Sequence, residues 1–360
     1  MSSILLTIDV EDWFQVENFK PWIPFSSWPS RELRVEKNTH RLLDLFDSVD
    51  SKGSETKKSC QSGKSCLPNE MHSSFNRGQK FEGVKATFFV LGWLAERLPN
   101  LVREIHARGH EVASHGYNHK LCYQQSPEDL KKDLTDSKKL LEDITGEPVL
   151  GFRAPNFSIN YDALNIIESC GYLYDSSYNS FAMHGRYGKL NLKGNERSGI
   201  AIPLFENQPP SVPASQRSSV SVSSIQKPAS RNQRPSIPAS QHPSFYELPI
   251  SNLEFKINNS KFVFPWGGGG YFRLIPFFIF TTGISAILRK TSGYVFYIHP
   301  WEIDADQQRV KEAKMAYKFR HYFNLDKTLS KLEKMLLNFA SCRFITCTQY
   351  LNLQKAVEVL

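Results

Sequence analysis

The chain has 360 residues, of which 40% are hydrophobic and 22% are charged. This composition excludes a wholly disordered chain and is sufficient for the core of one large α/β domain or two smaller ones. The formal charge of +8 is spread along the sequence without a basic block that contains aromatic residues, so we expect no nucleic-acid partner.

Short apolar strands alternate with amphipathic helices along most of the chain, which is typical of a parallel sheet or barrel with helices outside. The expected strands are residues 4–8, 85–92, 110–114, 149–152, 172–174, 245–250, 294–298 and 343–346. The expected helices are residues 35–49, 94–108, 127–145 and 161–170, followed by charged helices within 307–339. Ser126 is expected to cap the third of these helices, and Gly146 to end it.

Three stretches interrupt this alternation. Residues 51–81 are rich in Ser, Lys and Gly, and residues 206–244 are dominated by Ser, Pro and Gln. Such low-complexity tracts bury too little apolar surface to order themselves, so we predict two disordered insertions in one domain at 1–347, with a tail at 348–360. The WGGGG run at 266–270 is expected to be a flexible turn, because it lacks the ending of a phosphate-binding loop.

One apolar passage, LIPFFIFTTGISAIL at 274–288, resembles a membrane segment. It has 15 residues, includes Pro276 and Gly283, and is short for a span of about 20 residues. A buried helix is the first expectation and a peripheral membrane contact the second. The N-terminus lacks a signal-like apolar run, and the six cysteines form no CxxC pair, so we expect a cytoplasmic protein with free thiols that could contact the inner membrane face.

An acidic cluster follows the first strand, where Asp9, Glu11 and Asp12 fall within four residues. Carboxylates this close repel one another unless a cation, a hydrogen-bond network or catalytic work compensates them. The alternative is structural, because Asp and Glu also begin helices and line turns.

A candidate partner for these carboxylates is the SHGYNH motif, in which His115 and His119 follow another strand. Two imidazoles one helical turn apart can converge on a metal ion. Gly116 stands where the HExxH zinc proteases have their general base, so the base must come from elsewhere. The acidic cluster could complete a two-His, one-carboxylate site and leave another carboxylate to deprotonate water.

Three further polar residues follow strands. They are Arg153 in GFRAPNF, Asp175 in YDSS and His299 in FYIHPWEID. We expect Arg153 to hold a base ionised, His299 to protonate a leaving amine, and Asp175 to orient His299. Each residue has a structural alternative, as an ion pair, a core histidine or a helix cap respectively.

Taken in chain order, TIDVED, SHGYNH, RAPN, YDSS and IHPWEID resemble the motifs of the polysaccharide deacetylases, the NodB-homology or carbohydrate esterase 4 family. The resemblance covers residue 3 to about 346, apart from the insertions. HPWEID followed by FRHYFNLDKTLSKLEKML is most similar to the subfamily encoded with exosortase-linked exopolysaccharide genes. The fold that this implies is an α/β, distorted (β/α)7-type barrel with disordered insertions.

The resemblance also implies roles for individual residues. Asp9 would be the base and Arg153 would steer it, His115 and His119 would bind the metal, and His299 would be the acid. The backbone N–H of Asn156 would lie in the oxyanion hole, although the aromatic residue usual at that position is missing. The family's typical TFDD has adjacent aspartates, whereas here Val10 follows Asp9. The third metal ligand is therefore Asp12 by preference, with Glu11 as the alternative.

These features predict a metal-dependent hydrolase that removes N-acetyl groups from sugar units of a polysaccharide or its precursor, so an N-acetylated glycan is the expected partner. Zn²⁺ is the first expectation for the metal, and Co²⁺, Ni²⁺ or Fe²⁺ are alternatives. Three other functions stay open: an amidase acting on a non-sugar amide, a non-haem Fe(II) oxygenase and a non-catalytic glycan-binding protein. The oxygenase would need neither a separate base nor a histidine acid.

Overall fold

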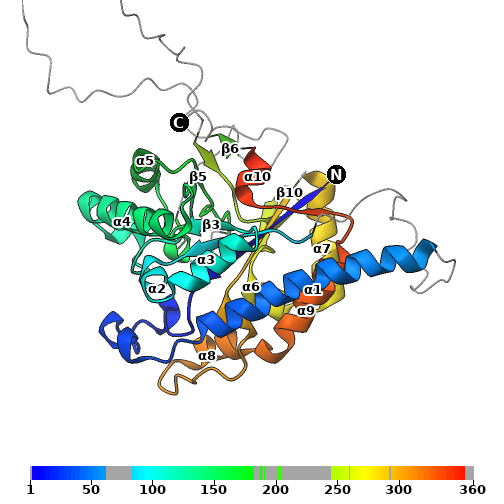
Figure 1. The fold of residues 1–360 in the computed structure, drawn as a ribbon, viewed down its shortest axis with the longest axis horizontal. Helices are drawn as coiled ribbons and strands as arrows, with labels where there is room; N and C mark the ends of the chain where they lie inside the picture. The colour runs from blue at the N-terminus through cyan, green and yellow to red at the C-terminus, as the bar shows by residue number, and fades with distance from the viewer. Residues whose placement is uncertain are drawn as a thin grey trace, which may run out of the picture.

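The computed structural model describes residues 2–61, 83–181, 187–188, 190, 202–203, 245–258, 260–291 and 293–352. A curled sheet lies at the centre, and helices surround it (Figure 1). Its strand order is β10-β1-β2-β3-β4-β5-β7-β6, with β11 beside β1. These strands are β1 (Ser3–Val10), β2 (Ala86–Val90), β3 (Glu111–Ser114), β4 (Gly151–Phe152), β5 (Tyr174–Asp175), β6 (Ile202–Pro203), β7 (Tyr246–Glu247), β10 (Gly293–Ile298) and β11 (Arg343–Phe344).

Every pairing from β10 to β7 is parallel, and only β6 runs antiparallel to its neighbour. This curled parallel sheet confirms the expected distorted (β/α)7-type barrel. β1 lies between β10 and β2, and all of its residues are buried. Burial on both faces explains why this strand reads as an almost continuous apolar run rather than an alternating one.

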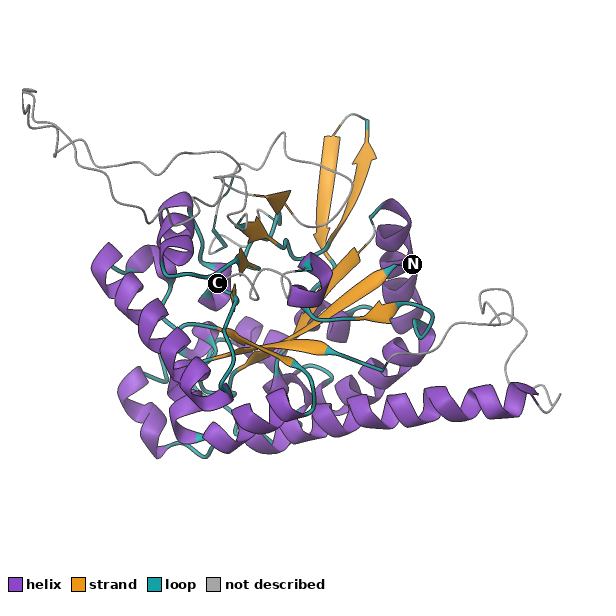
Figure 2. Ribbon diagram, turned by 45° about the horizontal axis from the view of Figure 1, so that its top comes forward, coloured by secondary structure: helices purple, strands orange, loops and turns teal. Residues whose placement is uncertain are grey.

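A hairpin of β8 (Asn252–Ile257) and β9 (Ser260–Pro265) occupies the gap between β7 and β10, and it projects from the sheet at the top of Figure 2. Before the hairpin, the Ile250 N–H donates to the Tyr178 carbonyl at 2.9 Å on the β5 side, and Ser251 Oγ accepts the Val295 N–H of β10 at 2.9 Å. After the hairpin, the Gly267 carbonyl accepts the Tyr297 N–H of β10 at 2.7 Å. The segments that flank the hairpin therefore bridge the open side of the barrel.

The prediction of a flexible turn at 266–270 is wrong. The backbone of this run lies directly against β10 and then enters helix α6 (Gly269–Leu274). A Cβ atom on Gly268 would lie 2.6 Å from Tyr297 Oη, and one on Gly269 would lie 2.1 Å from Glu302 Oε2. The glycines are needed for this close approach rather than for flexibility.

Most of the expected helices are confirmed within a few residues. The other helices are α1 (Val35–Gln61), α2 (Gly92–Arg97), α3 (Pro99–Ala107), α4 (Pro127–Thr145), α5 (Tyr161–Ser169), α7 (Phe277–Lys290), α8 (Met315–Tyr322), α9 (Leu325–Asn338) and α10 (Cys347–Leu351). The helix expected at 94–108 is divided at Leu98, because Pro99 lacks an N–H and starts a new helix. As expected, Ser126 caps α4, and Gly146 ends it with φ 74°.

The predicted insertions are only partly within the described residues. Helix α1 continues to Gln61, past its expected end at residue 49 and into the first predicted insertion. The rest of that insertion, the 206–244 insertion and residues 353–360 lie outside the described residues. The disorder of these segments and the domain bounds of 1–347 stay predictions.

The apolar passage at 274–288 forms most of α7, and one face of this helix is buried in the core. On that face, Phe280 stacks on Trp266 with ring centroids 5.4 Å apart. Across the described part of the chain, no helix is both long and apolar enough to span a bilayer. Cys122, Cys170, Cys342 and Cys347 are free thiols, as the spacing of the cysteines predicted.

We expect acid to destabilise the fold partly through His110. This residue is buried between Phe46 and Phe88, and its Nδ1 accepts a hydrogen bond from the Ala86 N–H. Burial, together with the charges of Lys85 and Arg108, lowers the pKa of His110 to about 3. Below about pH 6.5 the unfolded chain binds a proton that the folded chain excludes, so His110 costs about 1.4 kcal/mol of stability for each pH unit.

Urea unfolding of the wild type and His110→Gln between pH 7 and pH 5 tests this expectation. The variant should be less stable at pH 7, but its free energy of unfolding should fall less steeply as the pH decreases. The difference between the two slopes should correspond to about one proton. Parallel pH dependences of the two proteins would assign the acid sensitivity to other groups.

Candidate active site

Three buried side chains, Glu11, His115 and His119, meet beyond the carboxyl ends of β1 and β3. Glu11 Oε1 lies 3.0 Å from Nε2 of His115 and 3.0 Å from Nε2 of His119. The three donor atoms all lie within 4.8 Å of one another. Two imidazoles and one carboxylate at this spacing form a donor set that suits a divalent transition metal.

The hydrogen bonding of His115 supports a cation at this point. Its Nδ1 lies 2.7 Å from the Arg153 carbonyl, which can only accept, so Nδ1 carries the proton. A neutral His115 then turns the lone pair of Nε2 toward a Glu11 oxygen, which is also an acceptor. Two acceptors at 3.0 Å are favourable only with a proton or a metal cation between them, so the residues fit a metal.

The two histidines lie on a loop rather than on the helical turn that their spacing suggested. Gly116 and His119 both have left-handed backbone, with φ of 75° and 53°. A Cβ atom on Gly116 would lie 2.9 Å from Asp133 Oδ2, and that carboxylate accepts the Tyr117 N–H. A tight turn fixed by Asp133 therefore brings the two rings together.

The preference for Asp12 as a metal ligand is wrong. Its Oδ2 accepts the N–H groups of Arg34 and Val35, at 2.6 and 2.9 Å, and its Oδ1 accepts the Trp13 N–H. Asp12 therefore fixes the start of α1, while the alternative, Glu11, lies with the histidines. In extended chain, residues i and i+2 point to the same side, so Asp9 and Glu11 share a side and Asp12 points away from it.

Burial raises the pKa of Asp12 to about 6, against its hydrogen bonds from Val35, Arg34 and Trp13. Burial also raises the pKa of Glu11, but the charges of His119 and His299 and the close contacts with the rings of His115 and His119 outweigh it. The pKa of Glu11 therefore falls well below its ordinary value. Of the two carboxylates, Glu11 is held the more firmly in the charged form that a metal requires.

Asp9 is held by Arg153, as predicted. Arg153 Nη1 donates to Asp9 Oδ1 at 2.7 Å and to Thr7 Oγ1 at 2.7 Å. Its Nε and Nη2 donate to the carbonyl and the Oγ of Ser176, both at 2.8 Å. Arg153 is fully buried, so this bonding fixes the orientation of Asp9.

His299 follows β10 and is oriented by Glu302 rather than by Asp175. Its Nδ1 lies 3.0 Å from Glu302 Oε2, and Glu302 Oε1 accepts from Arg273 Nε at 2.9 Å. Burial lowers the pKa of His299, but the charges of Glu11, Glu302 and Asp9 raise it further, to about 9. The surrounding carboxylates therefore favour the protonated, proton-donating form of the ring.

The expectation that Asp175 orients His299 is wrong, because its carboxylate is bound within its own turn. It accepts from the N–H of Ser177 at 2.9 Å and from its Oγ at 2.7 Å. It also pairs with the Glu247 carboxyl, whose pKa burial raises well above its ordinary value. Ser177 Oγ in turn accepts the Ala154 N–H, so Asp175 supports the loop that carries Arg153.

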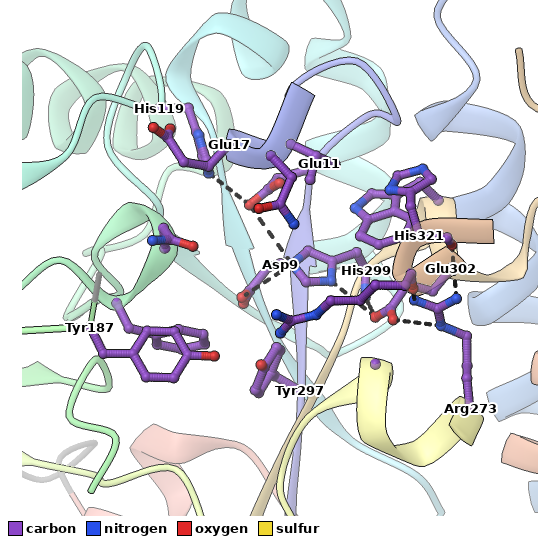
Figure 3. A pocket seen from close by; sticks show the side chains of 17 residues that line it. Asp9, Glu11, Glu17, His119, Tyr187, Arg273, Tyr297, His299, Glu302 and His321 are labelled. Carbon is purple, nitrogen blue, oxygen red and sulfur yellow. Dashed lines mark hydrogen bonds and ion pairs between the residues drawn. The ribbon is translucent and has the colours of Figure 1, made fainter. Parts of the chain in front are cut away.

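One cavity opens between these groups, and Figure 3 shows the side chains that line it. Its lining includes the expected residues Asp9, Glu11, His119, Asn156 and His299. Asn156 lies in a short turn with φ 51°, a conformation that asparagine tolerates better than most residues. Asp9 Oδ2 and His299 Nε2 are 3.9 Å apart in the cavity, too far for a direct hydrogen bond.

Sequence reasoning missed several lining residues: Arg273, Tyr187, Tyr297, Glu302 and His321. Glu302 lies three residues after His299, and this spacing was a usable signal for a side-chain pair. Arg273 and His321 carried no such signal. The ring of His321 stacks on Trp301 with centroids 4.1 Å apart, and Trp301 stacks on His299 with centroids 5.1 Å apart. The His299 ring is therefore also held by packing.

Comparison with known proteins gave two family matches. Residues 77–174 match the family described as Polysaccharide deacetylase, and residues 214–352 match one described as Domain of unknown function (DUF3473). His115, His119 and Arg153 lie in the first segment, whereas His299 and Glu302 lie in the second. Both segments therefore contribute to one cavity.

Two curated relatives resemble a limited part of the chain. A peptidoglycan deacetylase-like protein of Gibberella zeae is 38% identical over 93 residues, which are 26% of this chain and 28% of that protein. A peptidoglycan-N-acetylglucosamine deacetylase of Bacillus cereus is 38% identical over 88 residues, 24% of this chain and 41% of that enzyme. The chain thus spans less than half the length of either relative.

Among solved structures, a Mycobacterium smegmatis protein assigned to the polysaccharide deacetylases has 16% identity and a TM-score of 0.49, over 99% of this chain and 91% of that one.

The exchange of Glu11→Gln should weaken Zn²⁺ or Co²⁺ binding by on the order of 100-fold, because it removes the anionic donor. Asp12→Asn should leave the affinity nearly unchanged and lower the free energy of unfolding by about 1–2 kcal/mol, because it weakens the hydrogen bonds at the start of α1.

Calorimetric titration of metal-stripped protein and the visible spectrum of bound Co²⁺ measure the first effect, and urea unfolding measures the second. If Asp12→Asn abolished metal binding while Glu11→Gln did not, the ligand assignment would be reversed.

Proposed function

The chain carries a polysaccharide deacetylase domain, and on that premise we propose that it hydrolyses the N-acetyl groups of N-acetylated sugar units in a polysaccharide or its precursor. The observation that carries this proposal is one cavity that combines a candidate metal site, an Arg-held carboxylate and a protonated histidine. The B. cereus relative is named as a deacetylase of N-acetylglucosamine in peptidoglycan, which supports a sugar acetamide as the target.

Glu11, His115 and His119 would hold the metal, for which we propose Zn²⁺ first, with Co²⁺, Ni²⁺ or Fe²⁺ as alternatives. When bound, the ion would supply Lewis-acid polarisation of the acetamide carbonyl and of water. Asp9 accepts the proton of the attacking water, and the hydrogen bond from Arg153 keeps Asp9 aimed at the cavity.

His299 donates its proton to the departing sugar amine, so that acetate and a free amine are the products. The backbone N–H of Asn156 donates to the carbonyl oxygen as negative charge develops on it. Glu302, itself fixed by Arg273, keeps the proton-donating Nε2 of His299 turned toward the cavity. The resemblance to the exosortase-linked subfamily leads us to propose exopolysaccharide as the polymer.

Acetate release from N-acetylglucosamine oligomers tests the proposed activity. Metal-stripped protein should be inactive and should recover with Zn²⁺ or Co²⁺. Asp9→Asn and His299→Gln should each lower kcat by about 10²- to 10⁴-fold, because each removes a proton-transfer group. Glu104→Gln on the surface helix α3 is the control and should leave kcat unchanged.

Activity without metal, or full activity of both substitutions, would refute this assignment of roles. Metal binding without acetate release from any acetylated sugar would move the function to another amide or to glycan binding.

Glu302→Gln should lower kcat by about 10-fold or more and leave KM and the metal affinity nearly unchanged, because Glu302 acts through the orientation and charge of His299. Glu302→Asp should recover part of the lost rate, since it restores the charge. An equal loss in both variants, with altered metal affinity, would show that Glu302 only supports the fold.

A further inference from the structure

The end of α6 and the start of α7 expose apolar side chains that the core does not cover. Leu274, Phe278 and Ile279 are 37%, 70% and 42% exposed, although they fall within six residues of one another. The other face of α7 is buried through Phe280 and Ile284. Single exposed apolar residues are ordinary, but a contiguous group of them indicates an interaction surface. We call Leu274, Phe278 and Ile279 the α7 patch.

A groove with a basic wall borders this patch. It lies between helix α9 and the turn that joins α6 to α7. Residues 274–277 form its apolar wall, and Lys327, Lys331 and Lys334 line the other side. We call these three residues the lysine wall. No carboxylate is present among the described residues that line the groove.

The lysines differ in what they already bind. Lys331 Nζ donates to the carbonyl groups of Phe272 and Ile275 and so supports the end of α6. Lys327 and Lys334 are exposed and lie seven residues apart, two turns along one face of α9. These two ammonium groups can therefore meet an anionic partner beside the α7 patch.

We propose that the α7 patch and the lysine wall dock this protein onto the surface of an anionic lipid bilayer. Phe278 and its apolar neighbours would enter the boundary between headgroups and acyl chains, while Lys327 and Lys334 would pair with anionic headgroups. The exposed apolar side chains suit the acyl-chain boundary of such a bilayer, and the lysines suit its anionic headgroups. No carboxylate is present among the described residues that line the groove to oppose this contact. The proposal does not depend on the proposed deacetylase activity.

The position of Arg273 connects this surface with the active site. Arg273 lines the groove, and it also lines the cavity that contains Asp9 and His299. Docking at the groove would therefore hold the active-site cavity next to the bilayer. This contact would be peripheral and is the form of membrane association that the apolar passage at 274–288 left open.

Co-sedimentation of the full chain with vesicles tests the proposal. Vesicles of phosphatidylcholine with phosphatidylglycerol should bind the protein at low salt, and vesicles of phosphatidylcholine alone should bind it at least about 10-fold more weakly. The double variant F278S/I279S should weaken binding by about 10-fold or more at any salt concentration. K327S/K334S should weaken it by a similar factor at low salt and much less at high salt.

Matched controls come from the opposite flank of the sheet, where α4 and α5 lie (Figure 1). Y161S removes an exposed aromatic side chain from α5, and K132S/K139S makes the same charge change on α4. Both should bind vesicles as the wild type does. Unchanged metal affinity and acetate release from soluble oligomers show that every variant is folded.

Four outcomes would overturn the proposal, and the first three concern binding and oligomeric state. They are no binding to anionic vesicles, equal loss in the control variants, and a concentration-dependent dimer that F278S/I279S abolishes, since a second copy would then cover the patch. Displacement by dissolved inorganic phosphate at millimolar concentration would also overturn it, by reducing the lysine wall to a small-anion site. Failure of vesicle binding with acetate release intact would leave the proposed enzyme activity standing.

Discussion

Burial of the Arg153 guanidinium is the constraint on which the site depends. A buried cation is tolerated only when charge and hydrogen bonds compensate it fully, and Arg153 obtains them from Thr7, Asp9 and Ser176. Its carbonyl also fixes the tautomer of His115. The side chain and the backbone carbonyl of Arg153 thus tie together the ends of β1, β3 and β5, so one residue places both Asp9 and a candidate metal ligand.

The two family matches cover separate segments of the sequence, but both segments contribute strands to one sheet. β10 belongs to the segment of unknown function, yet it pairs with β1 from Ser3 to Ile8, at the centre of the sheet. That segment also supplies His299 and two residues that fix its ring, Glu302 and Arg273. The described residues of this segment therefore complete the barrel and its cavity, and the part matched as polysaccharide deacetylase has neither without them.

The parallel order of strands made much of the site predictable from sequence. Residues that follow successive parallel strands gather at one edge, which was enough to bring Asp9, His115, Arg153 and His299 together. The choice of Glu11 over Asp12 was also within reach, because alternation along extended chain gives it. The pairing of His299 with Glu302 could not be chosen over a pairing with Asp175 from the sequence, since it depends on the shape of the short turn after β10. The glycine run at 266–270 was misread because its function is a close approach to residues thirty positions away.

β1, the first strand of the chain, makes contacts with strands that are synthesised last. Thr7 Oγ1 donates to the Phe296 carbonyl across 289 positions, and β1 also pairs with β11 near residue 344. Contacts of such long sequence separation slow folding, because the loop between them must close first. During synthesis the first strand can pair with β2 early, but it waits for β10 and β11 until nearly all of the described chain has left the ribosome. Asp9 and His299 meet only at that late step, so a chain that ends before β10 lacks the complete cavity.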